Sequence, residues 1–101
     1  MSISVTRSVA HLPMNASANT NHTMNGTRLP PARHLLLEQH SEGTYIFRYA
    51  DKWNFSGDTW HPNAEEALGQ IEYEFDVTGL EWQPISEEAL IALTNQHRYA
   101  R

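Results

Sequence analysis

Histidine is the residue type in this sequence best suited to metal chemistry, and four histidines fall where the chain is expected to fold. They are His34, His40, His61 and His97. None of their spacings is the HxH, HxxxH or HExxH spacing that directs two rings at one ion. His34 and His40 share a predicted strand face but lie roughly 20 Å apart at the usual rise per residue. The sequence therefore predicts solvated or hydrogen-bonding histidines, with no metal and no cofactor.

The sequence also shows no recognisable motif for catalysis by a nucleophile or by a pair of carboxylates. The chain has no cysteine and no GxSxG motif. The serines that fit turn or cap positions are Ser41, Ser56 and Ser86. Glu65, Glu72 and Asp76 line one flank of a predicted helix, which is typical of a solvated face. Enzyme activity stays open, but the missing patterns favour a non-enzymatic role.

Charge and length narrow the remaining classes of function. The chain has 101 residues and a net charge of −5, which suits one small domain and argues against binding to a phosphate backbone. Three strands followed by a helix occur in some RNA- and DNA-binding modules, but this helix begins Asn63-Ala-Glu-Glu, where those modules place basic residues. No apolar run approaches the ~20 residues of a membrane span. The absence of cysteine agrees with a cytoplasmic location.

The elements expected to position these residues follow from periodicity, caps and turn residues. Strands are predicted over 34–40, 44–50, 58–61 and 80–85, a first helix from Asn63 to about Asp76, and a second helix capped by Ser86. We therefore predict an α+β fold in which a small antiparallel sheet, in β-β-β-α-β-α order, carries the helices on its surface.

A three-residue hairpin loop is predicted to set the register of the first two strands. With Gly43 in a left-handed conformation, the loop pairs Leu37 with Phe47. The helix-facing side of the sheet would then carry Leu35, Leu37, Tyr45, Phe47 and Tyr49. The helix would cover it with Ala64, Ala67, Leu68, Ile71 and Phe75. Trp60 is predicted to point into the same core.

Residues 1–27 differ in composition from the rest, so the single α+β domain is expected to span 28–101. Twelve of these 27 residues are Ser, Thr or Asn, and the apolar ones show no sustained period. We expect a disordered segment that can be removed without changing the melting temperature. Three alternatives stay open: a targeting segment, a true start at Met14 or Met24, and a functional tail.

Three short stretches carry a resemblance to other proteins. GDTWH at 57–61, EYEF at the end of the first helix and EWQPI at 81–85 resemble small uncharacterised bacterial proteins. The resemblance covers roughly residues 44–85 and implies no activity, substrate or cofactor. It favours a bacterial, cytoplasmic, non-enzymatic protein.

Aromatic residues outside the predicted core indicate an interaction surface. Trp53 and Phe55 fall in a loop, and Tyr73 falls on the outer face of the first helix near Gly69, where a glycine permits close approach. The alternative is that Phe55 folds under the sheet and Trp53 covers its edge. The sequence favours a protein-interaction module whose partner is another protein, a second copy, or its own second helix, and neither nucleic acid nor a membrane.

Overall fold

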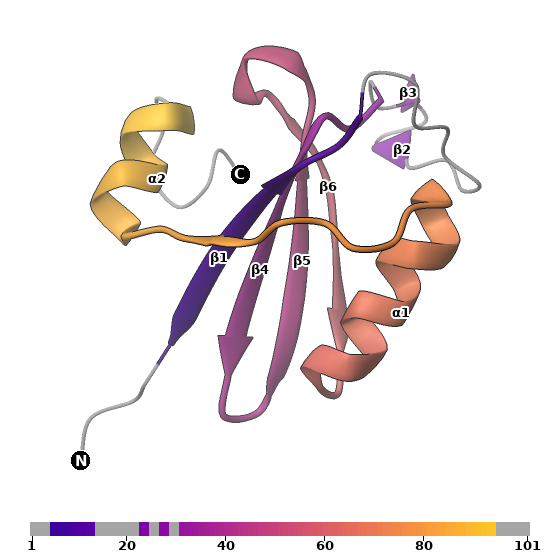
Figure 1. The fold of residues 1–101 in the computed structure, drawn as a ribbon. Helices are drawn as coiled ribbons and strands as arrows, with labels where there is room; N and C mark the ends of the chain where they lie inside the picture. The colour runs from indigo at the N-terminus through magenta and orange to yellow at the C-terminus, as the bar shows by residue number, and fades with distance from the viewer. Residues whose placement is uncertain (1–4, 14–22, 25–26, 29–30, 95–101) are drawn as a thin grey trace.

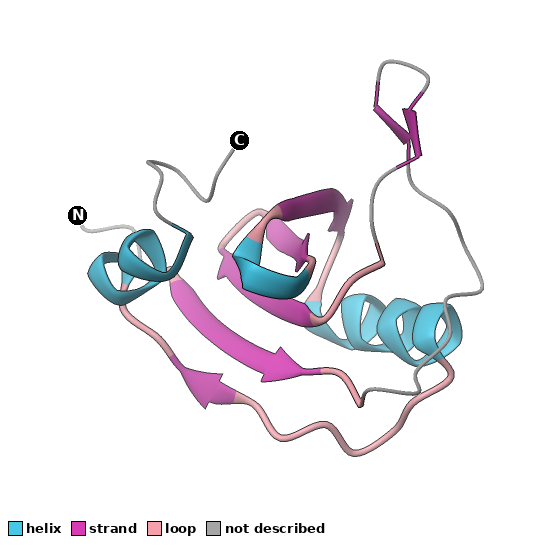
Figure 2. Ribbon diagram, turned by 90° about the horizontal axis from the view of Figure 1, so that it is seen from above, coloured by secondary structure: helices cyan, strands magenta, loops and turns pink. Residues whose placement is uncertain are grey.

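A five-stranded antiparallel sheet forms the centre of the computed structural model, which describes residues 5–13, 23–24, 27–28 and 31–94 (Figure 1). Its strands are β1 (Thr6–His11), β4 (His34–His40), β5 (Gly43–Tyr49), β6 (Phe55–His61) and β7 (Gln83–Pro84), in the order β6-β5-β4-β1-β7. The short strands β2 (Thr23–Met24) and β3 (Thr27–Arg28) pair only with each other, apart from this sheet (Figure 2). From residue 31 onward the predicted α+β class and β-β-β-α-β-α order are confirmed.

The first helix, α1 (Ala64–Phe75), begins and ends where local chemistry dictates. The Asn63 side chain accepts a hydrogen bond from the Glu66 amide at 2.9 Å, which satisfies one of the first unpaired N–H groups. At the other end Asp76 has φ 53° and closes the helix in a left-handed conformation. Both boundaries agree with the prediction.

The two helices cover opposite faces of the sheet (Figure 1). On one face α1 packs into a cluster of Leu12, Leu35, Leu37, Ile46, Ala67, Ile71 and Phe75. On the other face, α2 (Glu87–Thr94) contributes Leu90 to a cluster with Val9, Leu36, Phe47 and Tyr49. Both faces of the sheet are therefore buried, and α2 does not cover the outer face of α1.

The expectation that residues 1–27 lack structure is corrected for β1. This strand pairs antiparallel with β4 along six residues, from Thr6 opposite Gln39 to His11 opposite His34, and also pairs with β7. Val9 and Leu12 are buried in different clusters because the strand has both faces covered, so its apolar residues show no simple alternation. The domain thus includes β1. Residues 14–22 and 25–26 lie outside the described part of the chain.

The hairpin between β4 and β5 has a register that differs by one residue from the prediction. His40 pairs with Gly43, so Leu37 lies opposite Ile46 and Leu36 opposite Phe47. A one-residue shift moves a strand's side chains to the other face. Ile46 therefore faces α1, and Phe47 faces α2.

Trp60 does not enter the core, contrary to the prediction. Its side chain is 52% exposed on β6, and its indole lies across Gly43, where a Cβ would overlap the ring. Gly43 is therefore needed for this close approach. β6 also begins earlier than expected, at Phe55.

Besides α1 and α2, the described residues form a short 3-10 helix, η1 (Asp51–Trp53). None of these helices is long and apolar enough to cross a membrane. Residues 95–101, which include His97, one of the four histidines considered for metal binding, lie outside the described part.

Candidate functional site

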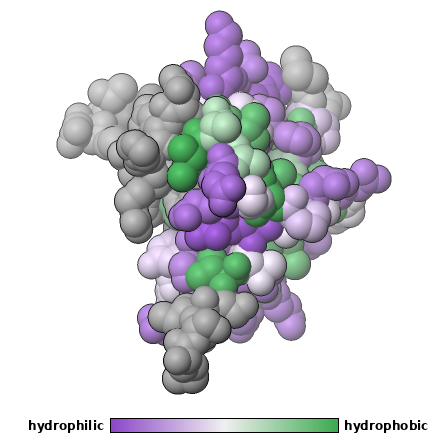
Figure 3. Space-filling view, turned by 90° about the vertical axis from the view of Figure 1, so that its left-hand side faces the viewer, coloured by the Kyte–Doolittle hydropathy of each residue, from purple (hydrophilic) through white to green (hydrophobic). Residues whose placement is uncertain are grey.

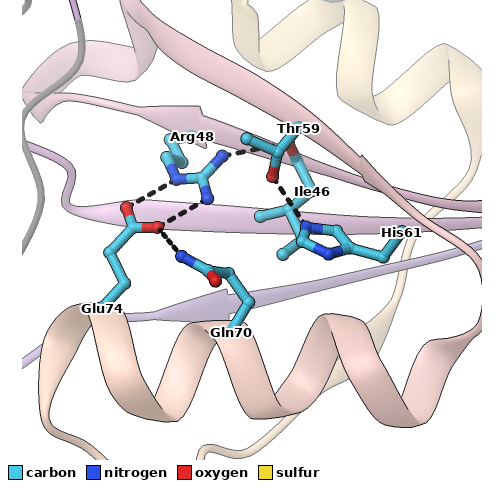
Figure 4. A network of polar contacts seen from close by, with 6 residues as sticks. All are labelled: Ile46, Arg48, Thr59, His61, Gln70 and Glu74. Carbon is cyan, nitrogen blue, oxygen red and sulfur yellow. Dashed lines mark hydrogen bonds and ion pairs between the residues drawn. The ribbon is translucent and has the colours of Figure 1, made fainter.

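A buried ion pair joins β5 to α1. The Arg48 guanidinium donates from Nε and Nη2 to the two carboxylate oxygens of Glu74, each at 2.7 Å, and both side chains are closed to solvent (Figure 4). Gln70, one turn earlier on α1, donates to Glu74 Oε1 at 3.1 Å. The predicted register puts Phe47 on the helix-facing side, and hence its neighbour Arg48 on the opposite face, so this pair was not expected. Since the pair is buried and its charges are matched, it holds the helix on the sheet and offers no open acid or base.

His61 lies beside this network. Its Nε2 is 2.9 Å from the Thr59 hydroxyl oxygen (Figure 4). Partial burial lowers the pKa of His61 below 6.5, and the Arg48 guanidinium lowers it further, while the carboxylates of Glu66 and Glu74 act in the opposite direction. The imidazole is therefore neutral at neutral pH.

A second polar cluster connects the other face of the sheet to α2. Glu38 accepts a hydrogen bond from Arg7 Nε at 3.0 Å and lies 2.6 Å from His40 Nε2. Arg7 Nη2 is also 3.6 Å from a carboxylate oxygen of Glu87, in the first turn of α2. The Glu38 carboxylate is therefore engaged from β1, whereas Arg48 of β5 is engaged by Glu74 on the other face of the sheet.

Two histidines meet at the end of β1. His11 and His34 are directly opposite, with 2.8 Å between their Nδ1 atoms and their rings nearly perpendicular. The indole of Trp53 stacks on His34, with ring centroids 4.3 Å apart and planes within 5° of parallel. Partial burial lowers the pKa of His34, the nearby His11 and Arg33 lower it further, and Asp51 opposes them. This contact was missed because His11 was placed in a segment without structure.

An apolar cleft of about 250 Å³ lies between α1 and the segment that follows it. It is lined by Leu68, Ile71, Glu72, Val77, Thr78, Gly79, Leu80 and Trp82. The predicted strand over 80–85 is reduced to β7, and residues 77–82 instead fold back irregularly against the helix. Leu68 is 36% exposed and forms part of one wall, so the cleft extends the core cluster to the surface.

The chain segment that forms this cleft is acidic. Residues 62–94 contain eight acids and no Lys, Arg or His. Glu72 lines the cleft, and the exposed Asp76 and Glu81 adjoin lining residues in the sequence. At about 100° per residue, Glu72 and Asp76 lie on α1 between Leu68 and Tyr73.

The four residues predicted to form an interaction surface divide into two places. Trp53 and Phe55 are partly buried against the cluster under α2, so the alternative interpretation describes them better. Gly69 and Tyr73 lie on the outer side of α1; Tyr73 is 63% exposed, and a Cβ at Gly69 would meet no atom within 4 Å. Only the α1 half of the predicted surface is therefore open.

The side of the molecule that carries α2 differs from the cleft side in how its hydrophobic residues are distributed. Figure 3 shows hydrophobic residues on this side separated by hydrophilic ones. Leu93, at 44% exposure, is the large apolar residue that α2 leaves open among its described positions.

The residues singled out for catalysis and metal binding do not converge. Glu65, Glu72 and Asp76 are all exposed on α1. In the described ranges no three His, Cys, Asp or Glu side chains form a group that could hold a metal ion. No protein-family model, curated protein or solved structure matches the chain.

Proposed function

We propose that this protein is a protein-interaction module that receives, in the cleft beside α1, an apolar side chain of a partner segment flanked by Lys or Arg. The observation that carries the proposal is an apolar cleft with Glu72 in its wall, formed by a chain segment, residues 62–94, that contains eight acids and no base. Its walls supply Leu68, Leu80 and Trp82 for contact with an apolar group. An exposed apolar hollow of this kind is a usual site for an anchoring side chain.

Charge complementarity selects the kind of partner. With Glu72 in the wall and no base between residues 62 and 94, a cationic segment is attracted and an anionic one is repelled. Tyr73 lies beyond the acidic strip and adds aromatic contact area for a segment that crosses it.

The arginine contacts favour a protein partner over nucleic acid. Arg48 is buried against Glu74, and Arg7 is engaged by Glu38 and Glu87. Phosphate binding needs several basic side chains gathered on one accessible face. Neither arginine meets that need.

The test is selection of random peptides on the immobilised full chain, followed by comparison with two variants. Leu68→Asp places a charge in the cleft wall, whereas Leu93→Asp makes the same change at a similarly exposed leucine on α2. We expect the enriched peptides to carry a large apolar residue next to Lys or Arg. They should be retained by Leu93→Asp and lost from Leu68→Asp and Tyr73→Lys.

Several results would count against the proposal. Enriched peptides that bind Leu68→Asp as well as the unaltered chain would remove the cleft as the site. Enriched peptides without positive charge would contradict the partner chemistry. Salt-sensitive micromolar binding of RNA or duplex DNA would replace a protein partner with a nucleic acid.

A further inference from the structure

The contact between His11 and His34 brings two metal-ligating atoms to one point. The residues are 23 positions apart in the chain, yet β1 and β4 place them opposite each other with 2.8 Å between the Nδ1 atoms. Two nitrogens at this distance share one hydrogen between them, so one ring donates and the other accepts. The two Nδ1 atoms, each a metal ligand when its hydrogen is on Nε2, are thus directed at the same small volume.

We infer that His11 and His34 bind one Cu²⁺ ion through their Nδ1 atoms, while the hydrogen between them moves through solvent to Nε2 of the donating ring. Bonds of about 2.0 Å to nitrogens 2.8 Å apart enclose an angle of roughly 90°. That angle joins neighbouring positions of a tetragonal Cu²⁺ site, whereas tetrahedral Zn²⁺ needs a wider one. Each bond to the ion then lies about 45° from the line that joins the two nitrogens, so both rings turn when the ion binds.

One ligand is packed against an indole and the other is exposed. Trp53 stacks flat on the His34 ring, and its own position depends on two consecutive non-glycine residues with left-handed backbone, Lys52 at φ 64° and Trp53 at φ 63°. Such backbone strain persists where the surrounding structure enforces it. His11 is exposed, so water can complete the coordination.

Two charged residues near the histidine pair have opposite effects on positive charge at His34. Asp51, which precedes Trp53, favours positive charge at His34, and Arg33 disfavours it. With two protein ligands the site differs from a closed structural metal site, which uses four. This inference is independent of the cleft beside α1, because the histidine pair lies at the β1–β4 end near Trp53.

The experiment is a titration of the full chain with CuCl₂, followed by tryptophan fluorescence and electron paramagnetic resonance. Bound Cu²⁺ should quench Trp53, which stacks on a ligand, and should give an axial signal split by two imidazole nitrogens. We expect a one-to-one phase that is lost in the double variant His11→Gln/His34→Gln. The matched control His40→Gln/His61→Gln removes two histidines elsewhere and should keep that phase.

Two further variants keep the test decisive. His11→Gln alone alters an exposed side chain and should also abolish the one-to-one phase, which covers the case in which changing His34 disturbs folding. Trp53→Phe should lose the quenching but keep the resonance signal. Retention of the one-to-one phase in folded His11→Gln, or a signal without two imidazole nitrogens, would overturn the assignment.

Discussion

Arg48 and Glu74 join strand β5 to α1 by two parallel hydrogen bonds inside the domain. The pair has the fork geometry that makes Arg–carboxylate contacts specific. Because burial removes both groups from water, the attraction between the two charges must offset the cost of desolvating them. The pair therefore fixes which side of α1 faces the sheet, and so which side carries the cleft.

Removing one member of this pair should destabilise the protein strongly. Glu74→Gln leaves the Arg48 charge buried without its carboxylate, and we expect a loss of about 3–5 kcal/mol in the free energy of unfolding by urea denaturation. Glu72→Gln is the matched control on the same helix; because Glu72 is exposed, the change should stay within about 0.5 kcal/mol. Equal effects of the two substitutions would contradict the role given to the pair.

His61 should make stability depend on pH. Its pKa is lowered in the folded protein, so the unfolded chain takes up a proton at a higher pH than the folded one. The stabilising contribution is present above a pH of about 6.5 and declines as the pH falls through the lowered pKa. The unaltered chain should lose more stability than His61→Gln between about pH 7.5 and about pH 5, as urea titrations at several pH values will show. Parallel curves would exclude a contribution from His61.

β1 should be essential to the fold. Leu12, which follows it, is buried beneath α1, so Leu12→Ala should cost about 2–5 kcal/mol in the free energy of unfolding. Leu93→Ala, at an exposed leucine, should cost less than about 1 kcal/mol. A chain that begins at Arg28 lacks the strand between β4 and β7, and we expect it to lose cooperative thermal unfolding. If that shortened chain melts like the full one, the pairing of β1 with β4 is wrong.

Gly69→Ala should stabilise the protein. The glycine lies within α1, where alanine is favoured by about 1 kcal/mol, and the added methyl group meets no neighbour. Differential scanning calorimetry should therefore show a higher melting temperature. A lower melting temperature would mean that the outer face of α1 is covered in the folded chain.

The elements after residue 33 were predictable because each has a local signal. The Asn63 cap and the apolar spacing of α1 lie within one turn of the residues that they organise. The register of β4 and β5 was not predictable in this way. Leu35, Leu36 and Leu37 are all buried, so either register satisfies the hydrophobic pattern, and only the loop length decides between them.

The candidate sites depend on contacts between distant segments, which explains why the sequence revealed them only in part. Tyr73 and Gly69 were identified from helical geometry alone, and both lie on the outer side of α1. The cleft also needs residues 77–82 to fold back on the helix, and no periodic pattern marks that segment. The His11–His34 contact needs β1, whose apolar residues are divided between two faces.

The position of β1 between β4 and β7 imposes an order on folding. β4, β5 and β6 follow one another in the sequence with short connections, so they can pair without closing a long loop. β7 has one partner among the described strands, β1, and these two come from opposite ends of the described sequence. Closing the longest loop carries the largest entropy cost. The chain should therefore complete its three-strand hairpin unit early and attach β7 last, which leaves the β7 end of the sheet as the first region to open in hydrogen exchange.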